Sequence, residues 1–188
     1  MELADLLREQ LKISATLAPE VAEFFRTDEL AKGDYFLRQG QVIGKLAFLR
    51  RGHLRSWTEA GDKEITQWIF TPNYLVADLY CLFFAQPARW NIQALESCTL
   101  LTLSEENYRR MSALVPNWAT LEKQFLAGCF GILEDRVFGF LSLTASERYA
   151  ALMQHQPDLF NTVPLRYLAS MLGMTPETLS RLRRAGIS

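Results

Sequence analysis

The side chains best suited to chemistry lie near the C-terminal end, in residues 165–184, which read LRYLASMLGMTPETLSRLRR. Arginine can bond both acceptors of a guanine edge and glutamate can accept from the cytosine amine, so Arg181 and Glu177 are suited to reading base pairs. Arg183 and Arg184 could hold phosphates. Besides Arg183, the candidate DNA-binding residues are Thr175, Pro176, Glu177, Ser180, Arg181, Arg184 and Arg166.

Two helices joined by a tight turn would position these side chains. Ala169 is small enough for two helices to touch, and Gly173 can adopt the positive φ of a turn. Thr175 is a good N-cap and Pro176 suits the first helical position, so a second helix is expected there with Leu179 facing inward. This pattern is typical of a helix-turn-helix, and the alternative is an ordinary helical hairpin with a basic surface.

The composition limits the remaining functions. Of the 188 residues 49% are hydrophobic, which supports a packed core. No apolar run approaches the roughly 20 residues that span a bilayer, so we expect a cytoplasmic protein with no membrane partner. Residues 164–188 carry four arginines and one acid, a local charge of +3 in a chain whose net charge is −1. This basic end favours a nucleic-acid partner.

Catalytic residues and a metal site are not expected. The two histidines, His53 and His155, are far apart in the sequence, and no Ser/His/Asp or Cys/His constellation can be placed in one site. The cysteines, Cys81, Cys98 and Cys129, lack metal-ligand spacing, so we expect reduced thiols that pack as small hydrophobes. No cofactor is predicted, and an enzyme on a cupin-like barrel ranks last among the alternatives.

The first half of the chain combines helices with an antiparallel β-structure. Residues 3–26 read as a lead-in helix or a helix pair with a break at Pro19, whereas residues 29–103 consist of short β-branched and aromatic runs between glycine and proline turns. The clearest hairpin surrounds Gly61, and a short helix is expected within 74–88. The expected strands are 35–38, 45–50, 53–59, 63–70, 90–96 and 98–103. Regular turns at this spacing favour a sandwich or barrel.

Helices are expected after this β-region at 104–114, 117–141 and 145–154. The second carries two apolar stripes and therefore needs cover on two sides. The stripe from Trp118 to Ile132 would face the chain's own barrel. The other has coiled-coil spacing and consists of Leu126, Phe130, Leu133, Val137 and Phe140. We expect it to pair with a second copy of the chain, and packing on the N-terminal helices is the alternative.

This order of parts resembles the transcription regulators of the cyclic-AMP receptor protein and fumarate–nitrate regulator (Crp/Fnr) family, over essentially the whole chain. Residues 32–40, KGDYFLRQG, and 46–52, LAFLRRG, are similar to the family's first strands and turns. Glu177, Ser180 and Arg181 match its E-x-x-S-R motif, which implies that they touch bases. The resemblance implies an α+β fold with a cyclic nucleotide-binding-like β-roll (jelly-roll), a long dimerisation helix and a helix-turn-helix. The family usually has a wing after this motif, and because the sequence ends at Ser188 we expect the helix-turn-helix to lack a full wing.

The family's phosphate-binding cassette is not preserved. It reads roughly F-G-E-L followed by R-S or R-T, and binds a cyclic phosphate through backbone N–H groups and an arginine. The matching positions, a candidate effector pocket, are Ala77, Asp78, Leu79, Ala88, Arg89 and Trp90. Ala88 stands where the arginine should be, and Arg89, one residue out of register, would point to the opposite strand face. Cyclic AMP is therefore not expected as effector, which leaves another small molecule or none.

The aromatic residues around this cassette allow two readings. They either fill the barrel as core or stack on an aromatic effector. These residues are Tyr74, Tyr80, Phe83, Phe84 and Trp90.

Three parts are predicted: a β-roll with flanking helices at 1–115, a dimerisation helix at 116–142 and a DNA-binding domain at 143–188. The expected function is a transcription regulator that reads a pseudo-palindromic site on double-stranded DNA as a homodimer, with RNA polymerase as a candidate partner. The alternative is a ligand-binding or protein-interaction module with vestigial DNA binding, since the sequence ends at Ser188, where a wing would follow.

Overall fold

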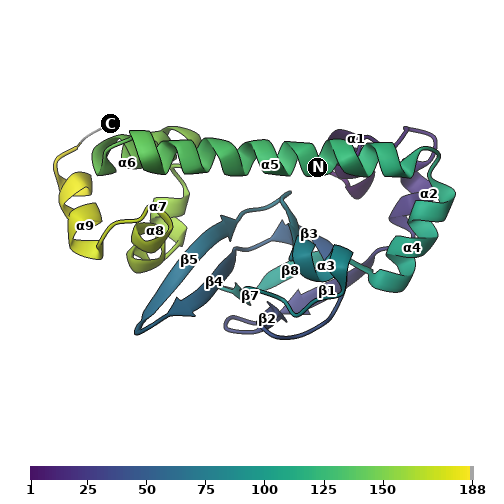
Figure 1. Cartoon of the computed structure of the whole chain (residues 1–188), viewed down its shortest axis with the longest axis horizontal. Helices are drawn as coiled ribbons and strands as arrows, with labels where there is room; N and C mark the ends of the chain where they lie inside the picture. The colour runs from purple at the N-terminus through teal and green to yellow at the C-terminus, as the bar shows by residue number, and fades with distance from the viewer. Residues whose placement is uncertain (187–188) are drawn as a thin grey trace. The chain divides into compact units, whose positions relative to one another are not determined.

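The structure, a computed structural model, describes residues 1–186, so the predicted lack of a wing after Ser188 falls outside the described residues. The strands are β1 (Arg26–Leu30), β2 (Tyr35–Leu37), β3 (Lys45–Arg51), β4 (Leu54–Ala60), β5 (Lys63–Phe70), β6 (Leu75–Ala77), β7 (Asn91–Ala94) and β8 (Cys98–Ser104). Within residues 1–186 they form two four-stranded sheets, of order β1-β8-β3-β6 and β2-β7-β4-β5 (Figure 1). The predicted α+β β-roll is confirmed.

Each predicted strand is present with ends shifted by at most a few residues, and the β4–β5 hairpin turns at Gly61 with φ +61°. Two strands, β1 and β6, were not predicted. The sequence of β1, RTDEL, has no apolar alternation, because it is an edge strand paired only with β8 and its side chains are largely exposed. Strand β6 is also at an edge and has only three residues.

The helices of residues 1–186 begin with predicted N-caps in three cases, Ser104, Thr144 and Thr175. They are α1 (Leu3–Gln10), α2 (Ala18–Ala22), α3 (Leu79–Phe84), α4 (Glu105–Leu114), α5 (Trp118–Ser142), α6 (Ala145–His155), α7 (Leu159–Thr162), α8 (Leu165–Met171) and α9 (Pro176–Arg184). Ser104 caps α4, and Thr144 with Glu147 forms a capping box on α6. The short helix α7 was not predicted, since four residues carry too little periodicity to recognise.

The chain divides into two compact units. The first unit contains residues 1–56 and 70–128, and its main core lies between the sheets, where Leu37, Leu49 and Leu100 are almost completely buried. A second core forms where α1, α2 and α4 gather around the first turns of α5 (Figure 1). Trp118 and Phe125 of α5 pack into this core, which is the alternative of packing on the N-terminal helices, and Ile132 of the same stripe is 53% exposed, so the predicted inward stripe is only partly inward.

The second unit contains residues 57–69 and the chain from Cys129 onward. It therefore joins most of the β4–β5 hairpin to the second half of α5 and to helices α6 to α9. Buried leucines such as Leu168 and Leu179 form its interior together with the aromatic pair Tyr149 and Phe160, whose ring centroids are 5.3 Å apart. Within residues 1–186 no helix is both long and apolar enough to cross a membrane.

Candidate functional site

The two C-terminal helices form the predicted helix-turn-helix. Between α8 and α9 the chain turns at Gly173, whose φ is +65°, and Met174 N–H donates to the Ala169 carbonyl at 3.0 Å. Ala169 is fully buried where the helices meet. Helix α9 begins with Pro176 in its first turn, and the hydroxyl of Thr175 accepts from Thr178 N–H at 3.2 Å. Both ends of the turn are therefore fixed by local chemistry.

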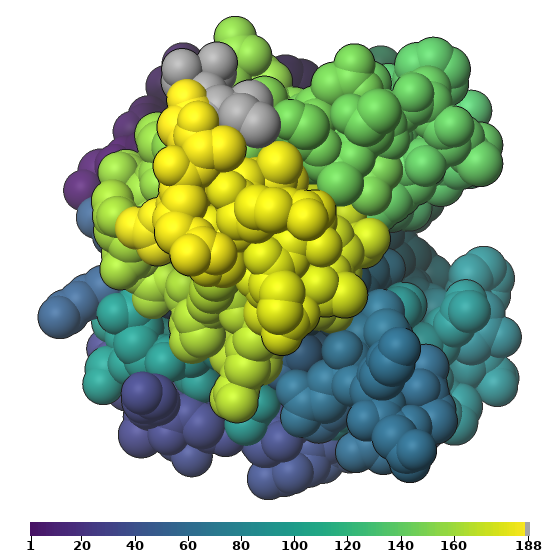
Figure 2. All heavy atoms as spheres, turned by 90° about the vertical axis from the view of Figure 1, so that its left-hand side faces the viewer, coloured from purple at the N-terminus to yellow at the C-terminus, as the bar shows by residue number. Residues whose placement is uncertain are grey.

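The outward face of α9 carries the predicted reading residues. Leu179 is fully buried, whereas Glu177, Arg181 and Arg184 are exposed and Ser180 is partly exposed. Figure 2 shows α9, in yellow, on the surface of the molecule. In the part of the chain that the structure describes, neither Arg181 nor Arg184 has an ion-pair partner. Their charges are thus available to an external anion.

The acid on this face is held in its ionised form. The backbone N–H of Glu177 itself and the Thr175 hydroxyl stabilise the carboxylate and lower the pKa of Glu177. An ionised carboxylate only accepts hydrogen bonds, which is the chemistry that a cytosine amine requires.

Arg166 lies apart from the other candidates, because it belongs to α8. Its Nη2 donates to the Tyr167 hydroxyl at 2.8 Å, and its guanidinium lies 4.7 Å from the centroid of that ring. The side chain is exposed and fixed near the start of α8. This geometry suits a phosphate contact rather than a base contact.

In the cassette the structure gives Asp78 an unexpected role. Its carboxylate caps α3, with Oδ1 accepting from Cys81 N–H at 3.0 Å and Oδ2 accepting from Arg89 N–H at 2.9 Å. Asp78 is 6% exposed. One buried carboxylate therefore occupies the N–H groups on both sides of the cassette loop. The signal in the sequence was an aspartate directly before the apolar run of residues 79–84, which is a capping pattern.

Backbone hydrogen bonds within the same unit hold Ala88, the next residue of the cassette. Ala88 is buried, its N–H donates to the Gln41 carbonyl at 2.8 Å, and its carbonyl accepts from Gly40 N–H at 2.9 Å. The Arg89 side chain is exposed, with its guanidinium 5.6 Å from the Tyr80 ring centroid. The side chain of Ala88 thus points inward, whereas that of its neighbour Arg89 points to solvent. Of the other cassette residues, Ala77, Leu79 and Trp90 are all half-buried.

The reading in which all the aromatic residues fill the barrel is wrong for two of them. Tyr80 is 44% exposed and Phe84 is 66% exposed, with ring centroids 5.4 Å apart on the outer side of α3. Phe83 instead lines a cavity of about 10 Å³, the room of about one water molecule. At its wall, Glu122 accepts from the Tyr108 hydroxyl and, at 3.1 Å, from Trp118 Nε1.

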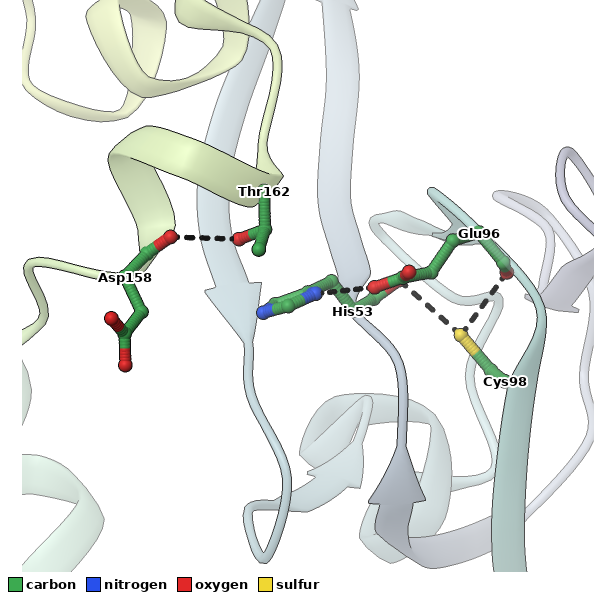
Figure 3. Close-up of polar contacts among 5 residues, drawn as sticks. All are labelled: His53, Glu96, Cys98, Asp158 and Thr162. Carbon is green, nitrogen blue, oxygen red and sulfur yellow. Dashed lines mark hydrogen bonds and ion pairs between the residues drawn. The ribbon is translucent and has the colours of Figure 1, made fainter.

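The cluster of His53, Glu96 and Cys98 holds a turn together (Figure 3). His53 Nδ1 lies 2.5 Å from Glu96 Oε1, and Cys98 Sγ donates to the backbone carbonyls of His53 and Glu96 at 3.4 and 3.3 Å. Burial raises the pKa of Cys98 to about 11, which keeps it a thiol rather than a nucleophilic thiolate. In the same figure, Thr162 Oγ1 donates to the Asp158 carbonyl at 3.0 Å.

Metal binding finds no support in residues 1–186, which contain no group of three or more His, Cys, Asp or Glu side chains that could hold an ion. The cysteines of this part of the chain are free thiols. Cys81 and Cys98 are buried, and Cys129 is half-buried.

Two residues that support the helix-turn-helix were missed. Arg136 on α5 and Arg148 on α6 donate to the Met171 and Leu172 carbonyls at the end of α8. For Arg136 a weak signal existed, because this charged residue stands four positions after Ile132 and continues the spacing of an otherwise apolar stripe. No pattern in the sequence pointed to Arg148.

Comparison with known proteins adds two findings. Residues 27–113 match the family model described as the cyclic nucleotide-binding domain. A search of curated proteins finds no match to the chain.

Solved structures share the fold over most of the chain. A CooA mutant from Carboxydothermus hydrogenoformans is 18% identical, with a TM-score of 0.65 over 94% of this chain and 86% of that one. The catabolite activator protein of Thermus thermophilus is 21% identical, with a TM-score of 0.61 over 96% and 85%. FixK2 from Bradyrhizobium japonicum is 15% identical, with a TM-score of 0.69 over 86% and 83%. At these identities the similarity is one of fold.

Proposed function

We propose that this protein is a cytoplasmic transcription regulator that binds double-stranded DNA as a homodimer. The match of residues 27–113 to the cyclic nucleotide-binding domain and the fold shared with Crp/Fnr-type regulators over most of the chain support the proposal. The observation that carries the proposal is the outward face of α9. Among the described residues it presents Arg181 and Arg184 without ion-pair partners, beside the ionised Glu177 on a helix with a fixed start. A helix of this kind can enter a major groove.

Separate roles follow from the positions of these residues. Glu177, Ser180 and Arg181 read bases, with Arg181 on a guanine edge and Glu177 on a cytosine amine. Arg166, Arg183 and Arg184 contact phosphates and fix the register, while Thr175 and Pro176 form the tip of the reading helix.

The DNA proposal is tested on a duplex selected by the wild-type protein from random sequences. Arg181→Ala should lose about 1–3 kcal/mol of preference for that duplex over a scrambled one, because the bidentate base contact is gone. Arg183→Ala should weaken binding to both duplexes equally and lower the salt slope by about one, as expected for a phosphate contact. Anisotropy titrations at several salt concentrations measure both effects.

The matched control is Arg109→Ala, which removes an exposed arginine of α4 that pairs with Glu105 at 2.6 Å. It should leave both affinities unchanged. If the wild-type protein and Arg181→Ala bind every duplex equally, specific reading by α9 is wrong and the vestigial alternative holds.

An exposed apolar row on α5 supports the homodimer. Phe130 is 62% exposed, Val137 57% and Leu141 82%. A contiguous exposed apolar surface of this kind is typical of a protein–protein interface. Phe140, predicted as the last residue of this seam, instead lies against Gly173 of its own chain, and Leu141 continues the row.

We further propose that the cassette does not bind a cyclic nucleotide. Asp78 already takes the N–H groups of Cys81 and Arg89, so a phosphate would have to displace a buried carboxylate of the same charge. Melting temperatures measured with cyclic AMP or cyclic GMP at millimolar concentration should equal those without nucleotide. A saturable rise in melting temperature would contradict this proposal without affecting the DNA-binding one.

A further inference from the structure

The end of α8 is bonded to the β-hairpin through one hydroxyl. Ser170 Oγ accepts from Thr66 N–H at 2.8 Å and donates to the Glu64 carbonyl at 3.2 Å. Both partners are backbone groups of β5, and Thr66 is 2% exposed. These bonds join the first helix of the helix-turn-helix to the hairpin that belongs to the same compact unit.

The next two residues of α8 are bonded to two further helices. Arg136 Nη2 of α5 donates to the Met171 carbonyl at 2.8 Å, and Arg148 Nε of α6 donates to the Leu172 carbonyl at 2.9 Å. Carbonyls at a helix C-terminus lack partners in the helix and carry its negative dipole end, so arginine is a suitable partner. Ser170, Met171 and Leu172 are therefore bonded to β5, α5 and α6, respectively.

The hydrogen bond to the Met171 carbonyl stabilises the positive charge of Arg136. Burial lowers the pKa of Arg136, and none of the described carboxylates pairs with its guanidinium. The group lies 5.2 Å from the Trp68 ring centroid and 5.3 Å from that of Phe140, so two aromatic faces and one carbonyl offset its charge. Moving α8 away would leave a half-buried cation with one partner fewer.

The residue that follows this triplet also touches α5. Gly173 has φ +65°, and a Cβ placed on it would lie 2.8 Å from Phe140 Cε1. Arg148 lies over the same ring, with its guanidinium 5.3 Å from the centroid. The turn before α9 thus rests directly on the helix that carries the proposed dimer seam.

We propose that Arg136 and Arg148 are positioning residues for DNA recognition, which hold the end of α8 on α5 and α6 and so fix where α9 points relative to α5. The inference rests on the proposed function. If α5 pairs with its copy, a fixed joint between α5 and α9 sets the distance between two recognition helices. It therefore determines which spacing of DNA half-sites the dimer accepts.

The test compares duplexes with the same selected half-sites at the selected spacing and at one base pair more or less. The wild-type protein should prefer one spacing. Arg136→Met keeps a long side chain on the two rings and loses the donor, so this preference should fall about tenfold, as for the loss of one charge-assisted hydrogen bond. Binding to a single half-site should not change, whereas a merely unstable variant would lose both.

Arg136→Lys retains a charge and a donor and should recover part of the preference. Arg109→Met is the matched control and should behave as wild type. An unchanged spacing preference in Arg136→Met, together with unchanged half-site binding, overturns the inference.

Hydrogen exchange tests the joint without DNA. In Arg136→Met, peptides covering α8 should exchange faster, while peptides of β3 and β8 in the other compact unit keep the wild-type rate and show that the variant is folded. If the exchange rate of α8 is unchanged, the inference that Arg136 holds the end of α8 on α5 is wrong. If instead exchange increases as expected but the wild-type protein selects no DNA site, the joint stands and the DNA-binding proposal fails.

Discussion

At the scale of single residues, the Asp78 carboxylate is an anion that belongs to the chain itself and binds the backbone N–H groups of the cassette. Its carboxylate joins the start of α3 to the backbone of Arg89 across the cassette loop. Hydrogen bonds to a buried charged group contribute more to stability than neutral ones, about 1.5–3 kcal/mol each. A residue at this position therefore stabilises the domain as well as shaping its pocket.

This role predicts a clear order of stability for variants at Asp78. Asp78→Ala should lower the free energy of unfolding by about 3 kcal/mol, because two buried N–H groups lose their acceptor. Asp78→Asn keeps one acceptor oxygen and should lose about half as much. Urea unfolding measures both. Glu9→Ala on the exposed side of α1 serves as control and should change stability by less than about 0.5 kcal/mol. Equal stability of all three variants would contradict the role.

Cys98 predicts a pH dependence of stability. Burial raises its pKa from 9.0 to about 11, so the folded chain holds this proton more tightly than the unfolded chain. The resulting stabilisation is fully present below pH 9 and is lost as pH rises through 11. Urea unfolding between pH 8 and 11 should therefore show a steeper loss of stability in the wild-type protein than in Cys98→Ala. Parallel curves would contradict the prediction.

At the scale of elements, α5 contains glycines whose replacement should strengthen it. A Cβ at Gly128 or Gly131 would meet no atom within 4 Å, and neither residue belongs to the exposed apolar row. Gly131→Ala should stabilise the protein by up to about 1 kcal/mol through helix propensity alone. Thermal unfolding followed by circular dichroism measures the change.

Gly173→Ala is the opposite case and serves as comparison. Its positive φ and the nearby Phe140 ring make any side chain strained, so this change should destabilise the protein. Changes of the same sign at Gly131 and Gly173 would contradict the account.

Elements with strong local signals could be predicted from the sequence. Thr175, Pro176 and Gly173 fix the boundaries of α9 through backbone chemistry within a few residues, and Gly61 marks the hairpin. Strand β1 could not be predicted, because it is formed by pairing with β8, whose paired residues lie 68 to 76 positions further along the chain, and not by its own polar residues.

The same distinction applies to the candidate site. The exposed face of α9 follows from helical spacing and the inward position of Leu179, both of which are visible in the sequence. The contact of Arg136 with Met171 spans 35 positions of the chain, and that of Asp78 with Arg89 spans 11 across the cassette loop. Their bonds depend on tertiary packing, which no local pattern encodes.

At the scale of the whole molecule, the proposed homodimer predicts the effect of a charge on α5. Val137→Glu would place a carboxylate in the exposed apolar row, and burying it against a second copy would cost several kcal/mol. Sedimentation should then show a monomer with wild-type circular dichroism and much weaker binding to the selected duplex.

Gln124→Glu adds the same charge elsewhere on the exposed surface of α5 and should remain dimeric. If Val137→Glu also sediments as a dimer, the row is not the interface.

The closed cassette has a consequence for how such a regulator would receive information. If Asp78 permanently occupies the place of a signal molecule, no metabolite sets the active fraction, and the amount of protein becomes the input. Below the dissociation constant of the dimer, the concentration of dimers rises with the square of the chain concentration. A twofold change in synthesis or degradation would then change operator occupancy about fourfold, so that gene dosage and proteolysis act as the signal.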